Sequence, residues 1–403
     1  MCAKKNASKK IMIFTYKKNT MMNITIEVSS NCQAKCPGCI RHDVLNTETG
    51  VFSNPPKNIN LSVEVHNKLI DEIKGKVSHL TYDGSFSDSP LHPDFLELIE
   101  YSASKLKGWF SFTGLNDLTI STNGSYKSPA FWKELGQILH KHLPYKHHVM
   151  FDLDGIDNKT QNMYRIGTNY PKIIENAEAF ISGGGRAVWK MIPFDFNEEL
   201  EERAKVLAEQ HGFKYFQRNR IQRVESKAVV LALSKKAGQL DKVVSEDNEL
   251  SVVSNKDIDI QVSKAESIIK DIKIDKNLDM FENLENARES IGVVCKWKKE
   301  NNYQISHDGS VWRCCWLNSA YQYKTRQNIG NRENWEQFMS KYDNDWNNLH
   351  SHSFRDIISH AFFTKDLEES FSNKYDDKVN PKLKVCTEKC SKLNLETTNR
   401  NNR

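Results

Sequence analysis

Residues 31–41 read Asn-Cys-Gln-Ala-Lys-Cys-Pro-Gly-Cys-Ile-Arg and place three thiols, Cys32, Cys36 and Cys39, on one short segment. Cysteines this close together can surround a single metal centre, and thiolate sets of this kind select iron–sulfur clusters or zinc. A cubane cluster has four irons, so three cysteines leave one iron without a protein ligand, much as catalytic zinc sites keep one position open. The segment therefore predicts a metal centre with an open coordination position.

Strand-like and helix-like patterns alternate from residue 24 to residue 216. Such alternation predicts parallel strands joined by helical crossovers, and six units are too few for a closed barrel of eight. Ligands of parallel α/β folds lie at the carboxyl ends of the strands, which is where the cysteine segment falls. The expected strands are 24–28, 77–82, 118–121, 149–153, 187–192 and 213–216, and the expected helices are 62–73, 93–106, 129–142, 170–181 and 198–210.

The loops that follow these strands carry polar residues suited to ligand binding. Residues 82–93 are rich in Gly, Ser and Asp, although an ordinary turn has the same composition. Asp152 and Asp154 alternate along a predicted strand, so they share a face, and a buried pair of carboxylates needs partners or a function. The glycines of 182–185 follow a predicted helix and precede a strand, which indicates a helix stop rather than a phosphate-binding loop.

Four histidines flank Pro144 at the end of a predicted helix: His140, His142, His147 and His148. A metal site is conceivable there, but the carboxyl end of a helix favours such side chains electrostatically, and we expect that simpler role.

A second group of cysteines lies far downstream. Thirteen residues separate Cys295 from Gly309, four more precede Cys314, and Cys386 and Cys390 follow. Residues 307–310, His-Asp-Gly-Ser, predict a tight hairpin turn between strands 303–306 and 311–314. The hairpin would bring the first two cysteines together, and the later pair would complete four thiolates around a closed centre.

The Cys-x3-Cys-x2-Cys segment after an apolar strand resembles the signature of the radical S-adenosylmethionine (SAM) enzymes. The resemblance implies a partial (β/α)6 TIM-like barrel with a small C-terminal cysteine-rich β-hairpin/α extension. It also implies a [4Fe-4S] cluster on Cys32, Cys36 and Cys39, with SAM chelating the open iron. Reductive cleavage of SAM would give a 5′-deoxyadenosyl radical that abstracts hydrogen from a substrate.

The same resemblance indicates residues for SAM. Members of the family usually carry Gly-Gly-Glu-Pro after the second strand, whereas this chain has Gly84-Ser-Phe-Ser-Asp88-Ser-Pro. Residues 121–124 resemble the family's Thr-Asn-Gly loop, residues 152–155 match its Ser-x-Asp-Gly position, and Arg165 fits the arginine that follows. The residues expected to contact SAM are Gly84, Ser85, Asp88, Ser121, Asn123, Asp152 and Asp154.

The order Cys-x13-Gly-x4-Cys followed by a cysteine pair resembles the SPASM extension of radical SAM enzymes in its single-cluster form. It implies one auxiliary [4Fe-4S] cluster on Cys295, Cys314, Cys386 and Cys390. Cys315 adjoins Cys314, and the glycine spacing makes Cys314 the ligand and Cys315 a spare thiol. Zinc remains open as the occupant of this site, because four thiolates also suit zinc.

Composition indicates the arm, the linker and the tail of the chain, and the two resemblances imply the bounds of the core and of the SPASM-like region. Residues 1–22 are expected to form a disordered basic arm, 23–219 the radical SAM core, 220–291 a polar linker with room for helices at 263–274 and 277–290, 292–392 the SPASM-like region and 393–403 a disordered tail. Met21 or Met22 is an alternative start. Nine cysteines without a signal sequence indicate a reducing compartment, so we expect a cytoplasmic protein without a membrane span.

The expected partners are SAM, a reductant such as flavodoxin or ferredoxin, and a substrate that is a peptide or protein side chain or a small metabolite. The twenty-odd residues before Asn23 are too few for a winged-helix leader-binding domain, which weakens the peptide option. The net charge of +5 is mild for 403 residues and does not indicate nucleic acid. The alternative function is a zinc-stabilised module that binds nucleic acid or protein, with both cysteine groups structural.

Overall fold

One open sheet of eight strands forms the centre of the protein. The structure is a computed structural model that describes residues 21–36, 39, 41, 58–107, 115–194, 196–219, 286, 289–290, 292–322 and 329–390. The strand order is β6-β5-β4-β3-β2-β1-β7-β8, and every pair is parallel except β7 with β8. The first six strands are β1 Met22–Ile26, β2 Val77–Tyr82, β3 Asp117–Thr122, β4 His147–Asp152, β5 Ala187–Met191 and β6 Tyr215–Arg218. The predicted partial barrel is confirmed.

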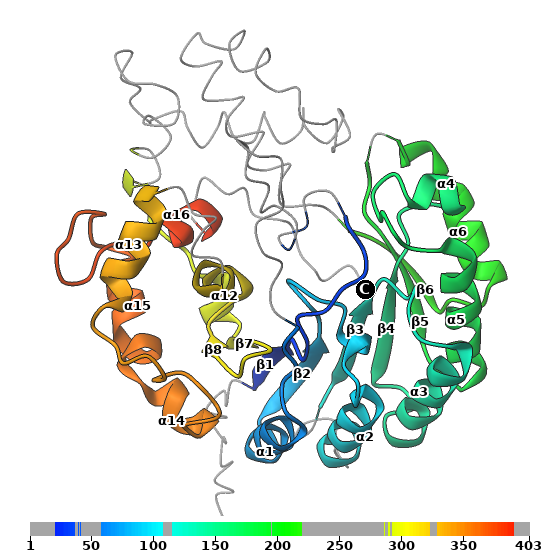
Figure 1. Cartoon of the computed structure of the whole chain (residues 1–403), viewed down its shortest axis with the longest axis horizontal. Helices are drawn as coiled ribbons and strands as arrows, with labels where there is room; N and C mark the ends of the chain where they lie inside the picture. The colour runs from blue at the N-terminus through cyan, green and yellow to red at the C-terminus, as the bar shows by residue number, and fades with distance from the viewer. Residues whose placement is uncertain are drawn as a thin grey trace, which may run out of the picture.

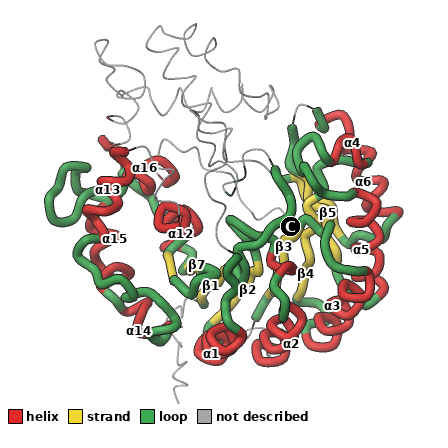
Figure 2. Tube along the Cα trace, in the orientation of Figure 1, coloured by secondary structure: helices red, strands yellow, loops and turns green. Residues whose placement is uncertain are grey.

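Five helices cover the outer side of this curved sheet (Figures 1 and 2). They are α1 Val63–Ile73, α2 Phe95–Leu106, α3 Pro129–His142, α5 Tyr170–Ser182 and α6 Glu201–Gln210. Short elements lie in the loops: η1 Ser89–Leu91, α4 Asn158–Gln161 and η2 Glu198–Leu200.

The helices begin where the sequence predicts because capping side chains satisfy their first amides. The Ser62 hydroxyl accepts a hydrogen bond from the Val65 amide at 3.2 Å, and Ser128 caps α3 ahead of Pro129. Strand β4 shows which side of the sheet is apolar, because Phe151 packs against Trp132 of α3. Asp152 is the next residue along the strand and therefore faces the inside of the barrel.

The predicted hairpin is present, but its place in the fold was not predicted. Strand β7, Asn302–Ile305, pairs in parallel with β1, and β8, Val311–Trp312, returns antiparallel to β7. The C-terminal region therefore continues the sheet of the N-terminal region rather than forming a separate layer. Its other elements are α11 Lys296–Lys299, α12 Cys315–Gln322, α13 Ile329–Met339, α14 Phe354–Ser359, the π-helical turn η3 Phe362–Asp366, α15 Leu367–Ser370 and α16 Lys384–Cys390.

Aromatic side chains form the core of this C-terminal region. Trp312 lies 5.7 Å from Trp335 and 6.2 Å from Trp346 between ring centroids, and Phe362 closes the group. The other two tryptophans thus pack against Trp312 of the hairpin strand β8.

Some predicted boundaries were wrong by about two residues. Strand β1 ends at Ile26, not at residue 28, and Val28 lies beyond it in the hydrophobic core, where its carbonyl accepts a hydrogen bond from the Leu61 amide at 2.9 Å. Strand β4 begins at His147, so two of the four histidines belong to a strand rather than to a helix end. The predicted helix 263–274 lies outside the described residues, as does 277–290 except for three positions; the tail and residues 1–20 of the arm also lie outside them.

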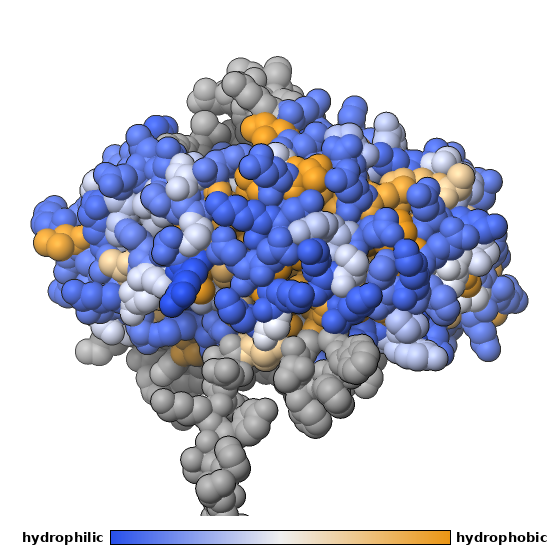
Figure 3. All heavy atoms as spheres, turned by 90° about the horizontal axis from the view of Figure 1, so that it is seen from below, coloured by the Kyte–Doolittle hydropathy of each residue, from blue (hydrophilic) through white to orange (hydrophobic). Residues whose placement is uncertain are grey.

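The described surface seen in Figure 3 is mostly hydrophilic, with hydrophobic side chains showing between charged ones. Among the described helices, none combines the length and the apolar character needed to cross a membrane.

Candidate active site

The cysteine loop follows β1 at the carboxyl edge of the sheet. Cys36 is buried, and Cys32 and Cys39 are partly exposed. The Lys35 amide donates a hydrogen bond to the Ile166 carbonyl at 2.7 Å, and the Cys39 amide donates to the Cys36 carbonyl at 3.1 Å. The loop is therefore fixed to the segment that follows β4.

Burial keeps the thiols of Cys32 and Cys36 protonated. It raises the pKa of Cys32 to about 12, with Asp88 adding to the shift, and that of Cys36 to about 11, although Arg165 acts in the opposite direction. Metal binding requires the thiolate, so loading of a metal centre would release protons. The three sulfurs are close enough for the charge of one to raise the pKa of another. This donor set fits a cubane cluster, in which each thiolate binds a separate iron.

A polar network joins the cysteine loop to two of the predicted SAM residues. The Asn123 side-chain amide donates to Asp88 Oδ2 at 2.7 Å and lies 3.8 Å from Cys32 Sγ. Gln33 Nε2 donates to Asn123 Oδ1 at 2.7 Å, and the Asp88 amide donates to the Asn31 carbonyl at 2.8 Å. Asp88 is buried, and burial raises its pKa to about 7. Asp88 and Asn123 thus stand beside the first cysteine.

The loop that contains Gly84 and Ser85 is tightly folded. A side chain at Gly84 would place its Cβ 2.3 Å from the Ser87 carbonyl oxygen, so only glycine fits. The Phe86 amide donates to Glu27 Oε1 at 2.7 Å, and Arg41 Nη1 donates to the Phe86 carbonyl at 2.9 Å. The backbone of this loop is consequently held from both sides.

Four charged side chains meet inside the barrel after β4 and β5. Arg165 Nε donates to Asp154 Oδ2 at 2.6 Å, and Arg165 Nη1 lies 3.2 Å from Asp152 Oδ2. Lys190 Nζ lies 3.0 Å from Asp152 Oδ1. The prediction that the two aspartates share a face agrees with their common partner, although β4 itself ends at Asp152.

The environments of the two aspartates differ. Asp154 is fully buried, and its Oδ1 accepts a hydrogen bond from the Ile192 amide at 2.7 Å. Burial raises its pKa, against the effect of Arg165. Burial also disfavours ionised Asp152, but Arg165 and Lys190 together hold its pKa below the usual value. Both oxygens of each aspartate thus face protein partners, and the two differ in exposure, since the side chain of Asp154 is 0% exposed and that of Asp152 is 14% exposed.

Ser121 is a buried residue of β3, paired in register with Met150 of β4. Ser121 alternates with Asp117 and Thr119 along β3, so the three side chains share one face of the sheet. On that face Asp117 Oδ1 lies 2.7 Å from His148 Nδ1. Ser121 thus lies on the inner side of the sheet, below Asn123.

Sequence reasoning did not single out Gln33, Arg41, Glu27 or Lys190. The last two left a signal, because each is a charged residue within an apolar run, Ile-Thr-Ile-Glu-Val and Ala-Val-Trp-Lys-Met. A charge that interrupts such a run is expected to be paired when buried.

The N-terminal region matches the model of a known protein family. Residues 26–209 match the radical SAM superfamily. The N-terminal region is therefore similar to a radical SAM domain. No curated protein matches the sequence. Enzymes of this superfamily use a [4Fe-4S] cluster and SAM as cofactors, and the matched region includes Cys32, Cys36 and Cys39.

Several solved structures are similar to the chain at low identity. SuiB of Streptococcus suis bound to the precursor peptide SuiA is 13% identical with a TM-score of 0.49, covering 92% of this chain and 72% of SuiB. Native anSMEcpe with bound AdoMet is 13% identical with a TM-score of 0.46, covering 91% of this chain and 94% of anSMEcpe. Methylornithine synthase (PylB) is 13% identical with a TM-score of 0.34, covering 51% and 55%.

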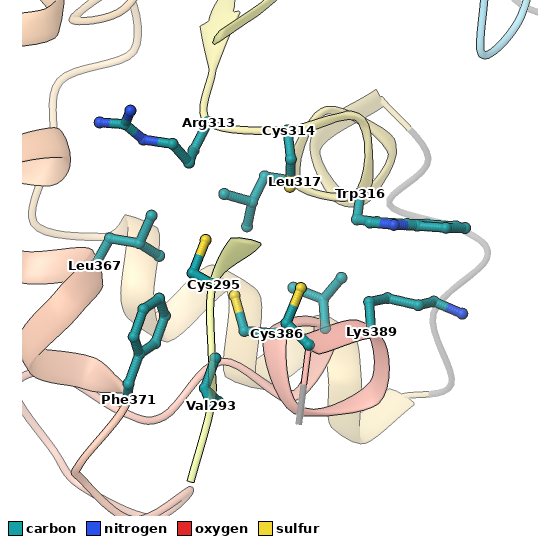
Figure 4. Close-up of a pocket in the computed structure, with 12 residues that line it drawn as sticks. Val293, Cys295, Arg313, Cys314, Trp316, Leu317, Leu367, Phe371, Cys386 and Lys389 are labelled. Atoms are coloured by element: carbon teal, nitrogen blue, oxygen red, sulfur yellow. The ribbon is translucent and has the colours of Figure 1, made fainter. Parts of the chain in front are cut away.

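Outside residues 26–209, the four downstream cysteines of the prediction line one pocket (Figure 4). Figure 4 shows Cys295, Cys314 and Cys386 directed into the space between α12 and α16. Apolar walls come from Leu317, Leu367 and Phe371. Of the two adjacent cysteines, Cys314 lines the pocket and Cys315 begins α12.

Burial raises the pKa of Cys295, Cys314, Cys386 and Cys390, and the neighbouring sulfurs add to the shift for the last three. The Val294 amide donates to the Cys390 carbonyl at 2.8 Å, which ties the two ends of the pocket together. Four thiols in one apolar pocket fit a closed cluster with a cysteine on each iron.

The remaining predicted sites have structural explanations. His147 Nδ1 lies 2.6 Å from the Leu143 carbonyl, and its Nε2 accepts a hydrogen bond from the Arg186 amide at 3.1 Å. The glycines after α5 allow a close helix contact, because a Cβ at Gly183 would lie 2.2 Å from the Lys133 carbonyl of α3. Across the described ranges, no three Cys, His, Asp or Glu side chains are grouped as they stand to hold a single metal ion.

Proposed function

We propose that this protein is a SPASM-type radical SAM enzyme that modifies a peptide or protein side chain or a small metabolite. In this proposal residues 23–219 form the core, residues 220–291 a linker and residues 292–392 the extension. The observation that carries it is the loop with Cys32, Cys36 and Cys39 at the carboxyl edge of an open parallel sheet, beside Asp88 and Asn123.

Cys32, Cys36 and Cys39 would bind the [4Fe-4S] cluster, leaving one iron for SAM. The bound cofactor would supply a 5′-deoxyadenosyl radical by reductive cleavage, with electrons from a protein such as flavodoxin or ferredoxin. The polypeptide's own work is to orient SAM, hold the substrate near it and exclude water.

The surrounding side chains suggest a division of roles. Asp88 offers a carboxylate beside Cys32 that suits the SAM amino group, and the backbone at Gly84 and Ser85 lies in the same loop. Asp152, Ser121 and Asn123 are polar groups of the inner face that suit ribose hydroxyls or the SAM carboxylate. Asp154 acts differently, because its side chain is fully buried and both of its oxygens accept hydrogen bonds, and it orients Arg165.

Cys295, Cys314, Cys386 and Cys390 would bind one auxiliary [4Fe-4S] cluster. Four protein ligands close such a centre, so its role would be structural or in electron transfer. The apolar walls of the pocket would limit contact with water, which is one way in which proteins set the potential of a cluster.

Metal analysis of anaerobically reconstituted protein tests this proposal. The wild type should bind about eight irons and eight sulfides, and both the triple variant Cys32→Ala/Cys36→Ala/Cys39→Ala and the double variant Cys386→Ala/Cys390→Ala should bind about four. SAM should change the electron paramagnetic resonance (EPR) spectrum of the wild type and of the double variant but not of the triple variant.

Reductant-dependent formation of 5′-deoxyadenosine should require the first three cysteines. A colourless protein that holds stoichiometric zinc and forms no 5′-deoxyadenosine would contradict the proposal and support a zinc-stabilised binding module instead.

A further inference from the structure

Glu27 is a buried carboxylate that the proposed chemistry does not use. It follows β1 directly, five residues before Cys32, and it is 0% exposed. Its Oε1 accepts the Phe86 amide at 2.7 Å, while within the described residues Oε2 has no hydrogen-bond partner. Burying a carboxylate costs free energy unless both of its oxygens are paired. A buried carboxylate with one oxygen that accepts no hydrogen bond is therefore a candidate for a functional role.

Phe86, the partner of Glu27, is the midpoint of residues 84–88, which we call the SAM loop. Arg41 donates to the carbonyl of Phe86 at 2.9 Å and also to the Ser30 carbonyl. Glu27 and Arg41 stand on either side of the cysteine loop in the sequence and carry opposite charges. The N–H and C=O of one residue of the SAM loop are thus held by charged groups from the two flanks of the cysteine loop.

The C-terminal region reaches the same point through His307, in the turn between β7 and β8. His307 Nδ1 lies 3.9 Å from Glu27 Oε2, and its ring packs edge-on against Phe86 with centroids 6.3 Å apart. His307 is 2% exposed, so this contact is shielded from water. Gln322 of α12 fixes the turn by donating to Asp308 Oδ2 at 2.7 Å.

The contact at Phe86 matters for the site because Asp88 is two residues further on. Asp88 is tied to the cysteine loop through the Asn31 carbonyl at 2.8 Å and faces Asn123 beside Cys32. Residues 84–88 form a tight turn without room for a Cβ at Gly84. A displacement of Phe86 would therefore be passed to Asp88 rather than absorbed within the loop.

We propose that Glu27 is a positioning residue for SAM binding, which holds the SAM loop against the cysteine loop and links it to the C-terminal hairpin through His307. The inference rests on the proposed function, since it takes Asp88 to lie in the SAM site. Glu27 acts through Phe86 and Asp88 and does not itself touch the cofactor. The hairpin would then be part of the SAM site's support, although it follows the core by a long stretch of chain.

SAM affinity of the full-length, reconstituted protein provides the first test. Glu27→Ala leaves the Phe86 amide without its charged acceptor and should raise the dissociation constant for SAM by about tenfold or more. Glu27→Gln keeps an oxygen for that amide and should stay within about threefold of the wild type. His307→Phe keeps the ring packing on Phe86 but removes the nitrogen near Glu27, and it should fall between the two.

Two controls separate positioning from general stability. His350→Ala changes an exposed histidine beside the hairpin turn and should leave the affinity for SAM unchanged. Iron content should equal that of the wild type in all variants. If Glu27→Ala fails to fold, Glu27→Asp replaces it, because the shorter side chain also withdraws the carboxylate from Phe86. Folded, iron-loaded variants with wild-type affinity for SAM would overturn the proposal.

Hydrogen exchange of the SAM-free protein gives an independent measurement. The Phe86 amide should exchange about tenfold faster in Glu27→Ala than in the wild type and faster in His307→Phe than in His350→Ala. Unchanged exchange at Phe86 would overturn the inference whether or not the wild type binds SAM. Absence of SAM binding by the wild type, with the exchange result as expected, would instead count against the proposed function alone.

Discussion

Replacing Asp154 by asparagine should destabilise the protein strongly, because it removes one charge from a buried ion pair. The Asp154 side chain is 0% exposed, accepts Arg165 Nε at 2.6 Å and accepts the Ile192 amide at 2.7 Å. Asparagine keeps one acceptor oxygen for Ile192 but turns an N–H₂ group toward the guanidinium. Removing one partner of a buried pair costs about 3–5 kcal/mol.

The lower end of that range is expected here, because burial already disfavours the ionised form of Asp154 and raises its pKa. A loss of about 3 kcal/mol would lower the urea midpoint by about 1 M, if the denaturant slope is at the upper end for small proteins.

Unfolding of the metal-free protein, followed by circular dichroism, is the assay for this change. Asp157→Asn is a matched control, since Asp157 is an exposed residue that caps α4 and asparagine caps helices equally well. Its midpoint should equal that of the wild type. Equal midpoints for the two variants would refute the assignment of Asp154 as the buried partner that holds Arg165.

Three further changes test other parts of the structure. Gly183→Ala should lower the free energy of unfolding by about 1–3 kcal/mol, because the new Cβ would lie 2.2 Å from a carbonyl of α3. Alanine favours helices more than glycine does, so a higher unfolding free energy would contradict the close α3–α5 contact. Cys314→Ser should halve the iron content of reconstituted protein and Cys315→Ser should not, and the reverse result would exchange their roles. Lys190→Met should destabilise the protein at pH 8 and progressively less as the pH falls below about 4. A carboxylate with a lowered pKa stabilises the fold above its unfolded pKa and loses this effect on acidification, so a pH-independent loss would exclude the pairing with Asp152.

Local signals in the sequence predicted the barrel well. The predicted bounds of α1 and α3 agree with the structure to within one residue, because the caps and apolar periods that define a helix act over one or two turns. Strand ends were less predictable. Val28 is a buried, β-branched residue of the kind that strands favour, yet it lies beyond the end of β1, and the sequence does not distinguish a buried strand residue from a buried loop residue.

The candidate site was predictable in its members but not in their pairing. The cysteines, Asp88, Asn123 and the two aspartates follow strands, and parallel strands bring such loops to one edge. Asp154 accepts a hydrogen bond from Arg165, and Asp152 pairs with Lys190. This choice depends on contacts between side chains that come from different strands and loops. No local sequence pattern predicts that choice, and no local pattern predicted that β7 of the hairpin would pair with β1.

The pairing of β7 with β1 has a consequence for synthesis of the protein. The Asn23 side-chain amide donates a hydrogen bond to the carbonyl of Glu300, which lies 277 positions later in the sequence. While the nascent chain emerges from the ribosome, β1 can pair with β2 early, but its other edge stays unpaired until the hairpin has been made. An unpaired strand edge is a template for association with other chains. Cells that express a fragment ending before residue 300 should therefore accumulate insoluble material, even though that fragment contains Cys32, Cys36 and Cys39.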